Sequence, residues 1–290
     1  MELVNRTEEP IDRLLIGRNL RDPGSAMIRL DGGTVESRDP RLGQTVYRLA
    51  RPLRPGERLA LRFSLTLSQS GLAPAAAPLV LRERFSALPL DEILPVVGYK
   101  LRFQLRDTVV RREQGLPPLA IEPPSRLQAR PNALRDDLVV LDSVVSTEVG
   151  QHGIAQGDIV QTWRSGGRSY TRFRTPMPIR NMPAFFSAPW AASLYVVGDH
   201  EVRVYAPQRL AADHPTILGT VDTLAWLDRA IGPYAGRTLS VIATPEIGLT
   251  GYALPQIVEL SDRFAFRAFP SADAQFSQAY RRAAHEASHQ

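Results

Sequence analysis

The segment RLALRFSLTLS, residues 58–68, decides the fold class of the first part of the chain. Every second residue in it is large and apolar: Leu59, Leu61, Phe63, Leu65 and Leu67. A period of two places successive side chains on opposite faces of a β-strand. One face of this strand is therefore expected to pack on a core and the other to meet solvent.

Other segments within residues 1–190 have the same short, turn-bounded pattern. Pro55-Gly56 predicts a chain reversal just before the first strand described, and Ser165-Gly166-Gly167 predicts a hairpin. Further strands are expected in VNRTEEPIDRLLI (4–16), TVYRLA (45–50), LVVLDSVVS (138–146) and both halves of DIVQTWRSGGRSYTRFR (158–174). Many short strands separated by turns are typical of an all-β domain, here a sandwich or a saddle.

The pattern changes near residue 190. LYVV and EVRVYA predict strands, and apolar residues then recur at helical spacing in Val221, Leu224, Leu227 and Ile231 before Gly232-Pro233 ends the helix. RTLSVIA predicts another strand. DAQFSQAYRRAAHEASH (273–289) predicts a second helix with its cap near Ser271 or Asp273. We therefore expect an α/β segment over residues 191–290.

Composition limits the classes of function. The 290 residues include no cysteine, so a metal could be held only by His and carboxylates. The net charge of +5 comes from scattered Arg with Lys100 as the single Lys, a pattern that argues against nucleic-acid binding. The start MELVNRTEEP has no apolar signal-peptide core, and no run reaches about 18 apolar residues. We expect a soluble chain.

The motif with chemical content is HEASH. His285 and His289 are four residues apart, so on a helix their imidazoles can reach one zinc ion from adjacent turns. Glu286 is rotated about 100° from His285, which keeps it out of the ligand set but near enough to act as general base. His152, His200 and His214 are predicted to be surface residues rather than ligands. No nucleophile elbow or phosphate loop is present.

The order of several segments along the chain resembles that of a known protein family. PMPIRNMPAFFSA, IGPY, RTLSVIATP, YALPQIVELSD and AHEASHQ follow one another along the chain. This series resembles the aminopeptidase N-like zinc metallopeptidases (gluzincins), most of all the branch fused to bacterial ABC transporter permease regions. The resemblance implies a β domain followed by the start of a thermolysin-like α/β catalytic domain. It also implies His285 and His289 as zinc ligands, Glu286 as the catalytic base and a peptide as substrate.

The resemblance also implies what lies elsewhere. In that family the third ligand, a Glu, and an oxyanion-stabilising Tyr follow the HExxH helix, so we expect them beyond Gln290. The chain would then be an N-terminal part of a longer, membrane-associated protein, with a β-rich domain (1–190) and an incomplete catalytic domain (191–290). It would have no useful peptidase activity alone. GYALP (251–255) stands where the best-known members have GxMEN, so the Glu that grips a free amino terminus is missing.

A second hypothesis stays open at this point. The same segments could form a non-catalytic binding or scaffold module of a membrane transporter assembly that has kept a peptidase-like fold. The two hypotheses differ in whether a metal site is completed.

Overall fold

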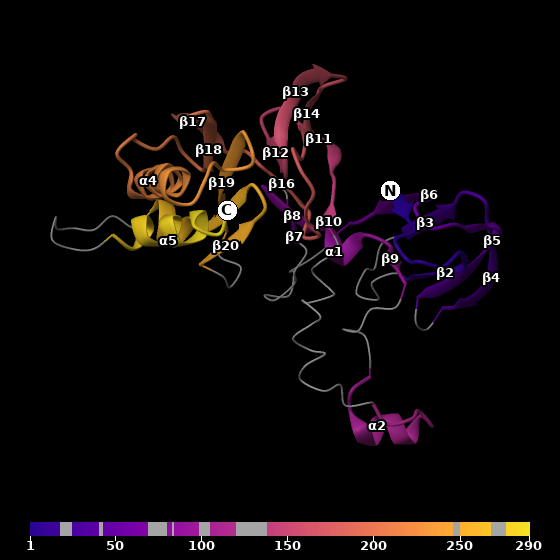
Figure 1. The fold of residues 1–290 in the computed structure, drawn as a ribbon. Helices are drawn as coiled ribbons and strands as arrows, with labels where there is room; N and C mark the ends of the chain where they lie inside the picture. The colour runs from indigo at the N-terminus through magenta and orange to yellow at the C-terminus, as the bar shows by residue number, and fades with distance from the viewer. Residues whose placement is uncertain are drawn as a thin grey trace. The chain divides into compact units, whose positions relative to one another are not determined.

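The computed structural model describes residues 1–17, 25–40, 43–68, 80–82, 84–98, 105–119, 138–245, 250–267 and 277–290. The chain forms two compact units. The first comprises Met1–Ser68 with Glu92–Asp137, and the second comprises Gln69–Asp91 with Leu138–Gln290. Most regular structure in both is β (Figure 1).

The first unit is a small β structure. Its strands are β1 (Glu2–Val4), β2 (Ile11–Gly17), β3 (Ser25–Leu30), β4 (Gly33–Asp39), β5 (Gln44–Leu53), β6 (Arg58–Thr66) and β9 (Val96–Val97), and it contains the short helix α2 (Thr108–Glu113). They form a three-stranded sheet, β1-β6-β3, and a four-stranded sheet, β4-β5-β2-β9. The helical turn α1 (Leu90–Ile93) joins the two units in sequence.

The predicted strand at residues 58–68 is confirmed as β6. Leu61 is fully buried, and Leu59 packs partly buried against the same apolar cluster. The predicted reversal before β6 is confirmed too, because Gly56 has a φ of 78° that suits glycine best. The cluster joins residues of both sheets: Leu14, Ile16, Leu30, Tyr47, Leu49, Leu53 and Leu61.

The second unit begins with three small sheets. Its first strands are β7 (Val80–Arg82), β8 (Phe85–Pro89), β10 (Leu138–Val139), β11 (Asp142–Glu148), β12 (His152–Ala155), β13 (Asp158–Ser165), β14 (Arg168–Arg174), β15 (Ile179–Arg180) and β16 (Ala184–Ala188). The sheet orders are β10-β15, β11-β14-β13 and β12-β16-β8-β7. The hairpin predicted at Ser165-Gly166-Gly167 is confirmed between β13 and β14, with φ values of 54° and 72° at the two glycines.

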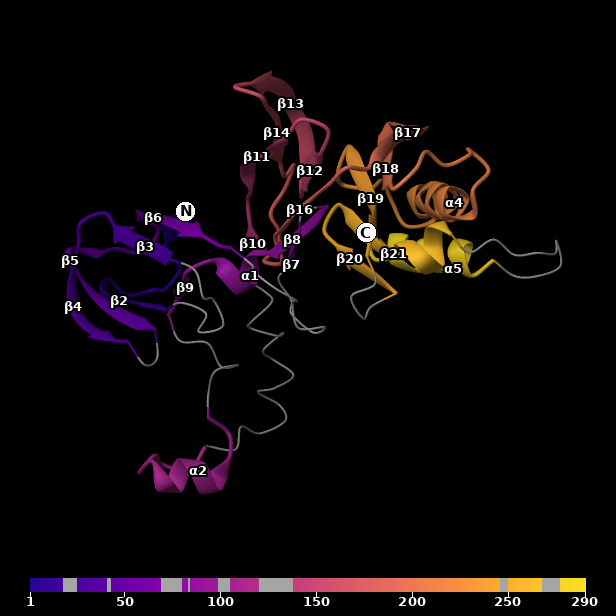
Figure 2. The same cartoon turned by 180° about the vertical axis from the view of Figure 1, so that it is seen from behind.

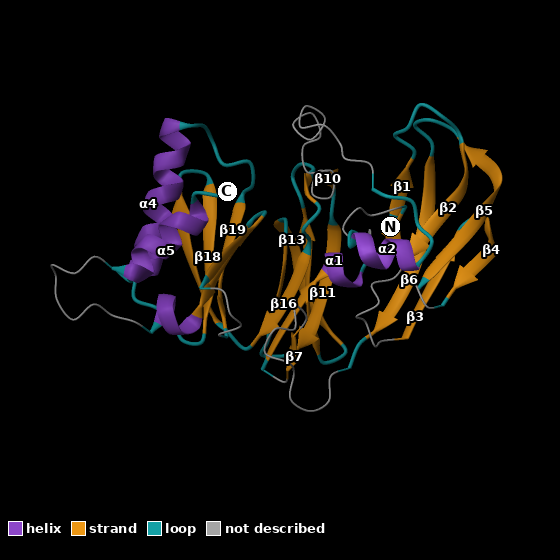
Figure 3. Cartoon of the chain, turned by 90° about the horizontal axis from the view of Figure 1, so that it is seen from below, coloured by secondary structure: helices purple, strands orange, loops and turns teal. Residues whose placement is uncertain are grey.

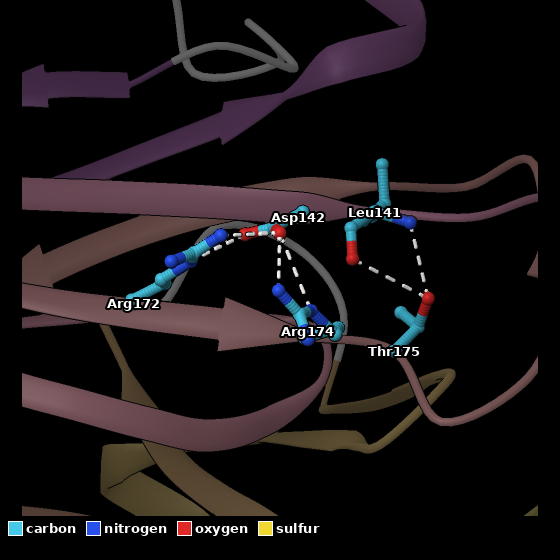
Figure 4. Close-up of polar contacts among 5 residues, drawn as sticks. All are labelled: Leu141, Asp142, Arg172, Arg174 and Thr175. Atoms are coloured by element: carbon cyan, nitrogen blue, oxygen red, sulfur yellow. Dashed lines mark hydrogen bonds and ion pairs between the residues drawn. The ribbon is translucent and has the colours of Figure 1, made fainter.

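Polar contacts fix β11 against β14. Asp142 accepts hydrogen bonds from the guanidinium groups of Arg172 and Arg174, and this holds the pKa of its carboxyl well below the usual range. At the end of the pair, Thr175 Oγ1 accepts a hydrogen bond from the Leu141 amide at 3.0 Å (Figure 4). Both strands keep one register along their length, from Asp142 opposite Arg174 to Glu148 opposite Arg168.

A five-stranded sheet with helices on one face completes the second unit (Figure 3). Its strands are β17 (Ala191–Val197), β18 (His200–Ala206), β19 (Thr238–Thr244), β20 (Gly251–Leu254) and β21 (Ile257–Ser261), in the order β17-β18-β19-β21-β20. The helices are α4 (Pro215–Ala230), the short π-helix η2 (Asp262–Phe266) and α5 (Gln278–Ala287). Every residue of the central strand β19 is buried. The core of the unit therefore lies around this strand.

Helix α4 differs from its prediction at both ends. It starts at Pro215, with the buried His214 as N-cap: Nδ1 of His214 accepts a hydrogen bond from the Thr216 amide at 3.2 Å. Ile231, predicted to be on the apolar face, is the C-cap and is 77% exposed. Leu224 is buried as expected. An imidazole cap is outside the usual cap residues, so the sequence pattern missed the first turns.

Helix α5 lies against α4, as both side views show (Figures 1 and 2). The contact is close because α4 has Gly219 where it meets the backbone carbonyl of Tyr280. On the facing side of α5, Ala279 and Ala283 are fully buried. The small residues of both helices let the backbones approach, which positions α5 beside the sheet.

The predicted fold class, a β-rich N-terminal part followed by an α/β segment, is confirmed. The predicted domain boundary between residues 190 and 191 stays a prediction. The division into two compact units puts residues 138–190 together with the α/β segment, but it does not test where one domain ends and the next begins. Among the described residues, no helix has the length and apolarity needed to span a membrane.

Gly219→Ala tests the contact between the helices. At an exposed helix position this change would stabilise the fold by about 1 kcal/mol. Here the new methyl group would clash with the carbonyl of Tyr280, so we expect the free energy of unfolding to fall by about 1–3 kcal/mol. Urea denaturation followed by circular dichroism measures the change, and a stabilised variant would contradict the close approach.

Candidate metal centre

The candidate site lies at the C-terminal end of α5. The helix begins after Ser277, whose hydroxyl accepts a hydrogen bond from the Tyr280 amide at 3.2 Å. The caps predicted at Ser271 and Asp273 lie outside the described residues. Tyr280 donates from its hydroxyl to Asp222 of α4 at 3.0 Å, and Arg282 donates to Thr250 just before β20. These bonds fix α5 to both α4 and the sheet.

The two faces of α5 differ in burial. Ala283 and Ala287 are fully buried, whereas His285 and His289 are exposed. The small buried face holds the helix in the domain, and the exposed imidazoles remain accessible to an ion. Glu286 lies between these faces and is 8% exposed.

The structure brings the two predicted ligands together. Nε2 of His285 and Nε2 of His289 are 3.3 Å apart, and the rings are nearly perpendicular. His289 lies past the regular helix: α5 ends at Ala287, Ser288 is the C-cap, and the His289 amide donates to the Glu286 carbonyl at 3.3 Å. The predicted helix through His289 therefore ends two residues earlier than expected, although the rings still converge.

This spacing fits zinc. Two nitrogens bound to zinc at about 2.0–2.1 Å with a tetrahedral angle are separated by about 3.3 Å. Neutral imidazoles are common zinc ligands, and the ligand atoms of His285, Glu286 and His289 all lie within 4.8 Å of one another. In the part of the chain that the structure describes, this is the one group of three such side chains that could hold a metal.

The carboxylate of Glu286 is oriented by the edge strand β20. A Cβ atom added at Gly251 would lie 2.7 Å from Oε1 and 2.9 Å from Cγ of Glu286. A residue with a Cβ at this position would force the Glu286 side chain to move away from the strand. The first residue of GYALP therefore shapes the site, although the sequence pattern drew attention only to the missing Glu of that segment.

A second carboxyl group lies near the first. Glu259 is on β21, directly across from Tyr252 of β20, and is half-buried. Burial and the negative charge of Glu286 raise the pKa of Glu259 from 4.5 to about 8. Glu259 is therefore largely protonated at neutral pH, which limits the repulsion between the two groups.

The remaining histidines do not join the site. His152 is exposed, as predicted, but His200 and His214 are buried, so the prediction that they are surface residues is wrong. His200 has Nδ1 3.0 Å from the carbonyl of Gly236, and His214 caps α4. Both serve the fold, as expected for residues outside the ligand set.

Sequence patterns alone did not identify three residues of this region: Gly251, Glu259 and Gln290, whose side chain hydrogen-bonds to the turn between β20 and β21. Glu259 had a visible signal, since a carboxyl group stands in an otherwise apolar strand. The other two depend on the β20–β21 hairpin lying next to the end of α5, which no local pattern encodes.

Comparison with known proteins bears on the fold of the chain. No protein-family model matches the chain, and no curated protein matches it. Solved structures do: an M1 zinc metallopeptidase from Deinococcus radiodurans has a TM-score of 0.62 at 17% identity, over 99% of this chain and 58% of that one. The chain therefore has the fold of the N-terminal part of M1 zinc metallopeptidases, the aminopeptidase N family.

Two further structures give the same result. A two-domain M1 zinc metallopeptidase mutant bound to L-arginine has a TM-score of 0.59 at 16% identity, over 98% of this chain and 58% of that one. A Deinococcus radiodurans mutant bound to a Tyr-Ser-Ala substrate has a TM-score of 0.56 at 16% identity, over 90% and 55%. The chain spans less than two thirds of these proteins. Nothing in the comparisons supports a link to an ABC transporter permease.

Glu259→Gln tests the paired carboxyl groups. The pKa of Glu259 is higher in the folded chain than its ordinary 4.5, so the folded state holds a proton that the unfolded state has lost between about pH 4.5 and 8. Stability should fall with rising pH in this window, by at most about 1.4 kcal/mol per pH unit.

The substitution removes that proton exchange, so we expect a flatter pH profile and a relatively more stable variant near pH 8. Chemical denaturation at pH 5, 6.5 and 8 measures both. An unchanged slope would show that Glu259 does not carry the extra proton.

Proposed function

We propose that this chain contributes to a zinc-dependent peptidase, with His285 and His289 as metal ligands and Glu286 as general base. The observation that carries the proposal is the 3.3 Å separation of the two Nε2 atoms, which is the separation that a tetrahedral zinc requires. The shared fold with M1 zinc metallopeptidases supports it independently of the motif.

In this proposal the metal ion and Glu286 have separate chemical roles. Bound zinc lowers the pKa of water and polarises a peptide carbonyl. Glu286, held against Gly251 beside the imidazoles, would be the group that takes a proton from water at such a site and returns it to the leaving amine. Its backing by the strand matters because a general base must lie within hydrogen-bond reach of the proton it takes.

The ligands of the fold relatives support a peptide as the substrate class. The related structures hold L-arginine and a Tyr-Ser-Ala substrate, and we extend the peptide substrate to this chain as part of the proposal. The segment GYALP, now placed at β20 and its turn, has no carboxylate to bind a free amino terminus. We therefore expect weaker preference for free amino termini than a GxMEN strand would give.

The non-catalytic scaffold hypothesis makes the opposite prediction. A transporter module that merely keeps the fold needs neither converging imidazoles nor a buried carboxylate beside them, so it would not bind zinc through these residues. No observation among the described residues favours that hypothesis, and a zinc titration would distinguish the two.

Zinc binding is the first test. We expect the chain to bind one zinc ion per molecule, weakly because only two imidazoles converge, and to lose this binding in His285→Ala. Isothermal titration calorimetry measures it. His152→Ala is the matched control, because His152 is also exposed but lies on β12 away from the site. Equal binding by wild type and His285→Ala would remove the proposal.

Peptide turnover is the second test. A catalytic zinc uses three protein ligands and a water, and only two imidazoles converge in the described residues. We therefore expect the 290-residue chain to release no product from fluorogenic aminoacyl or tripeptide substrates, even with added zinc. Turnover that a chelator abolishes and Glu286→Gln eliminates would contradict the incomplete site.

A further inference from the structure

The second ligand lies where the helix no longer holds it. His289 follows the C-cap Ser288, and its amide makes a longer, three-residue turn bond of 3.3 Å to Glu286. A helix end of this kind frays easily. Something outside the helix must therefore fix the backbone at His289 if its ring is to stay near His285.

The next residue supplies that contact. Oε1 of Gln290 accepts a hydrogen bond from the Gln256 amide at 2.9 Å, and its Nε2 donates to the Leu254 carbonyl at 3.1 Å. One carboxamide thus satisfies a donor and an acceptor at the turn of the β20–β21 hairpin. This hairpin also carries Gly251, the residue that backs Glu286.

The hairpin turn is itself firmly held. Gln256 has a φ of 62°, a conformation that costs a non-glycine residue about 1 kcal/mol or more. Its side chain stabilises the turn by donating to Asp158 at 3.1 Å and to the Thr238 carbonyl at 3.3 Å. Asp158 in turn accepts hydrogen bonds from the amides of Arg237 and Thr238, both at 2.8 Å. Gln290 therefore binds to a rigid part of the domain.

We propose that Gln290 is a positioning residue for the metal site: its side chain ties the turn that carries His289 to the β20–β21 hairpin and so sets the distance between the two imidazoles. The inference rests on the proposed function, because it assigns a role within the same zinc site. Both hydrogen bonds of the Gln290 carboxamide are to backbone groups of the hairpin, so Gln290 acts through the backbone.

The test compares two variants that each remove one hydrogen-bonded anchor of α5. Gln290→Ala removes the bonds to the hairpin, whereas Tyr280→Phe removes the bond to Asp222 near the start of the helix. Zinc titration of the full 290-residue chain gives the affinity, and hydrogen exchange gives the protection of the Gln256 amide.

We expect Gln290→Ala to bind zinc about tenfold more weakly, the lower end of the range for residues that orient metal ligands, and to speed exchange at Gln256. Tyr280→Phe should leave both unchanged, even if it lowers the unfolding midpoint. Gln290→Asn should behave as Gln290→Ala, because its shorter side chain cannot span Leu254 and Gln256.

The outcomes are distinct. Zinc affinity of Gln290→Ala within twofold of wild type would overturn the positioning role, as would an equal loss in Tyr280→Phe, which would indicate general fastening of the helix. If wild type and His285→Ala bind zinc alike, the proposed function itself fails and the role of Gln290 fails with it.

Discussion

The close approach of α5 to α4 is the constraint on which the site depends. Gly219 lets the backbone of α5 come against α4, and the alanines of α5 fill the space without pushing the helices apart. Because a buried interface of small residues cannot slide without opening a cavity or a clash, the direction of α5 is fixed. The exposed His285 and the buried Glu286 then follow from the rotation of the helix.

The edge hairpin β20–β21 contacts residues at the end of α5 that the packing on α4 does not fix. Glu286 lies against Gly251, and Gln290 bonds to the turn of the same hairpin, so Glu286 and the turn that carries His289 are both in contact with β20 and β21. The β20–β21 hairpin therefore contacts both Glu286, within α5, and Gln290, after the end of α5. The rigidity of its turn comes from Gln256 and Asp158, residues with no chemistry of their own in the site.

Sequence patterns predicted the parts that depend on local periodicity. The strand β6 and the hairpin at Gly166-Gly167 follow from alternation and turn residues, and the pair His285 and His289 follows from helical spacing. The patterns failed where an unusual residue or a segment distant in sequence determines the local structure. Helix α4 starts at an imidazole N-cap, His214, and helix α5 ends before His289. The partnership of Glu259 with Glu286 needs strand pairing that no single segment reveals.

The cap of α4 has a consequence for behaviour in acid. Burial lowers the pKa of His214, so its ring stays neutral in the fold and can accept the Thr216 amide, whereas an unfolded chain takes up a proton below about pH 6.5. Lowering the pH therefore reduces the stability of the fold at the N-cap of α4. Since α5 packs on α4 at Gly219, acid would also weaken the support of the helix that carries His285, through a histidine that is not part of the candidate site.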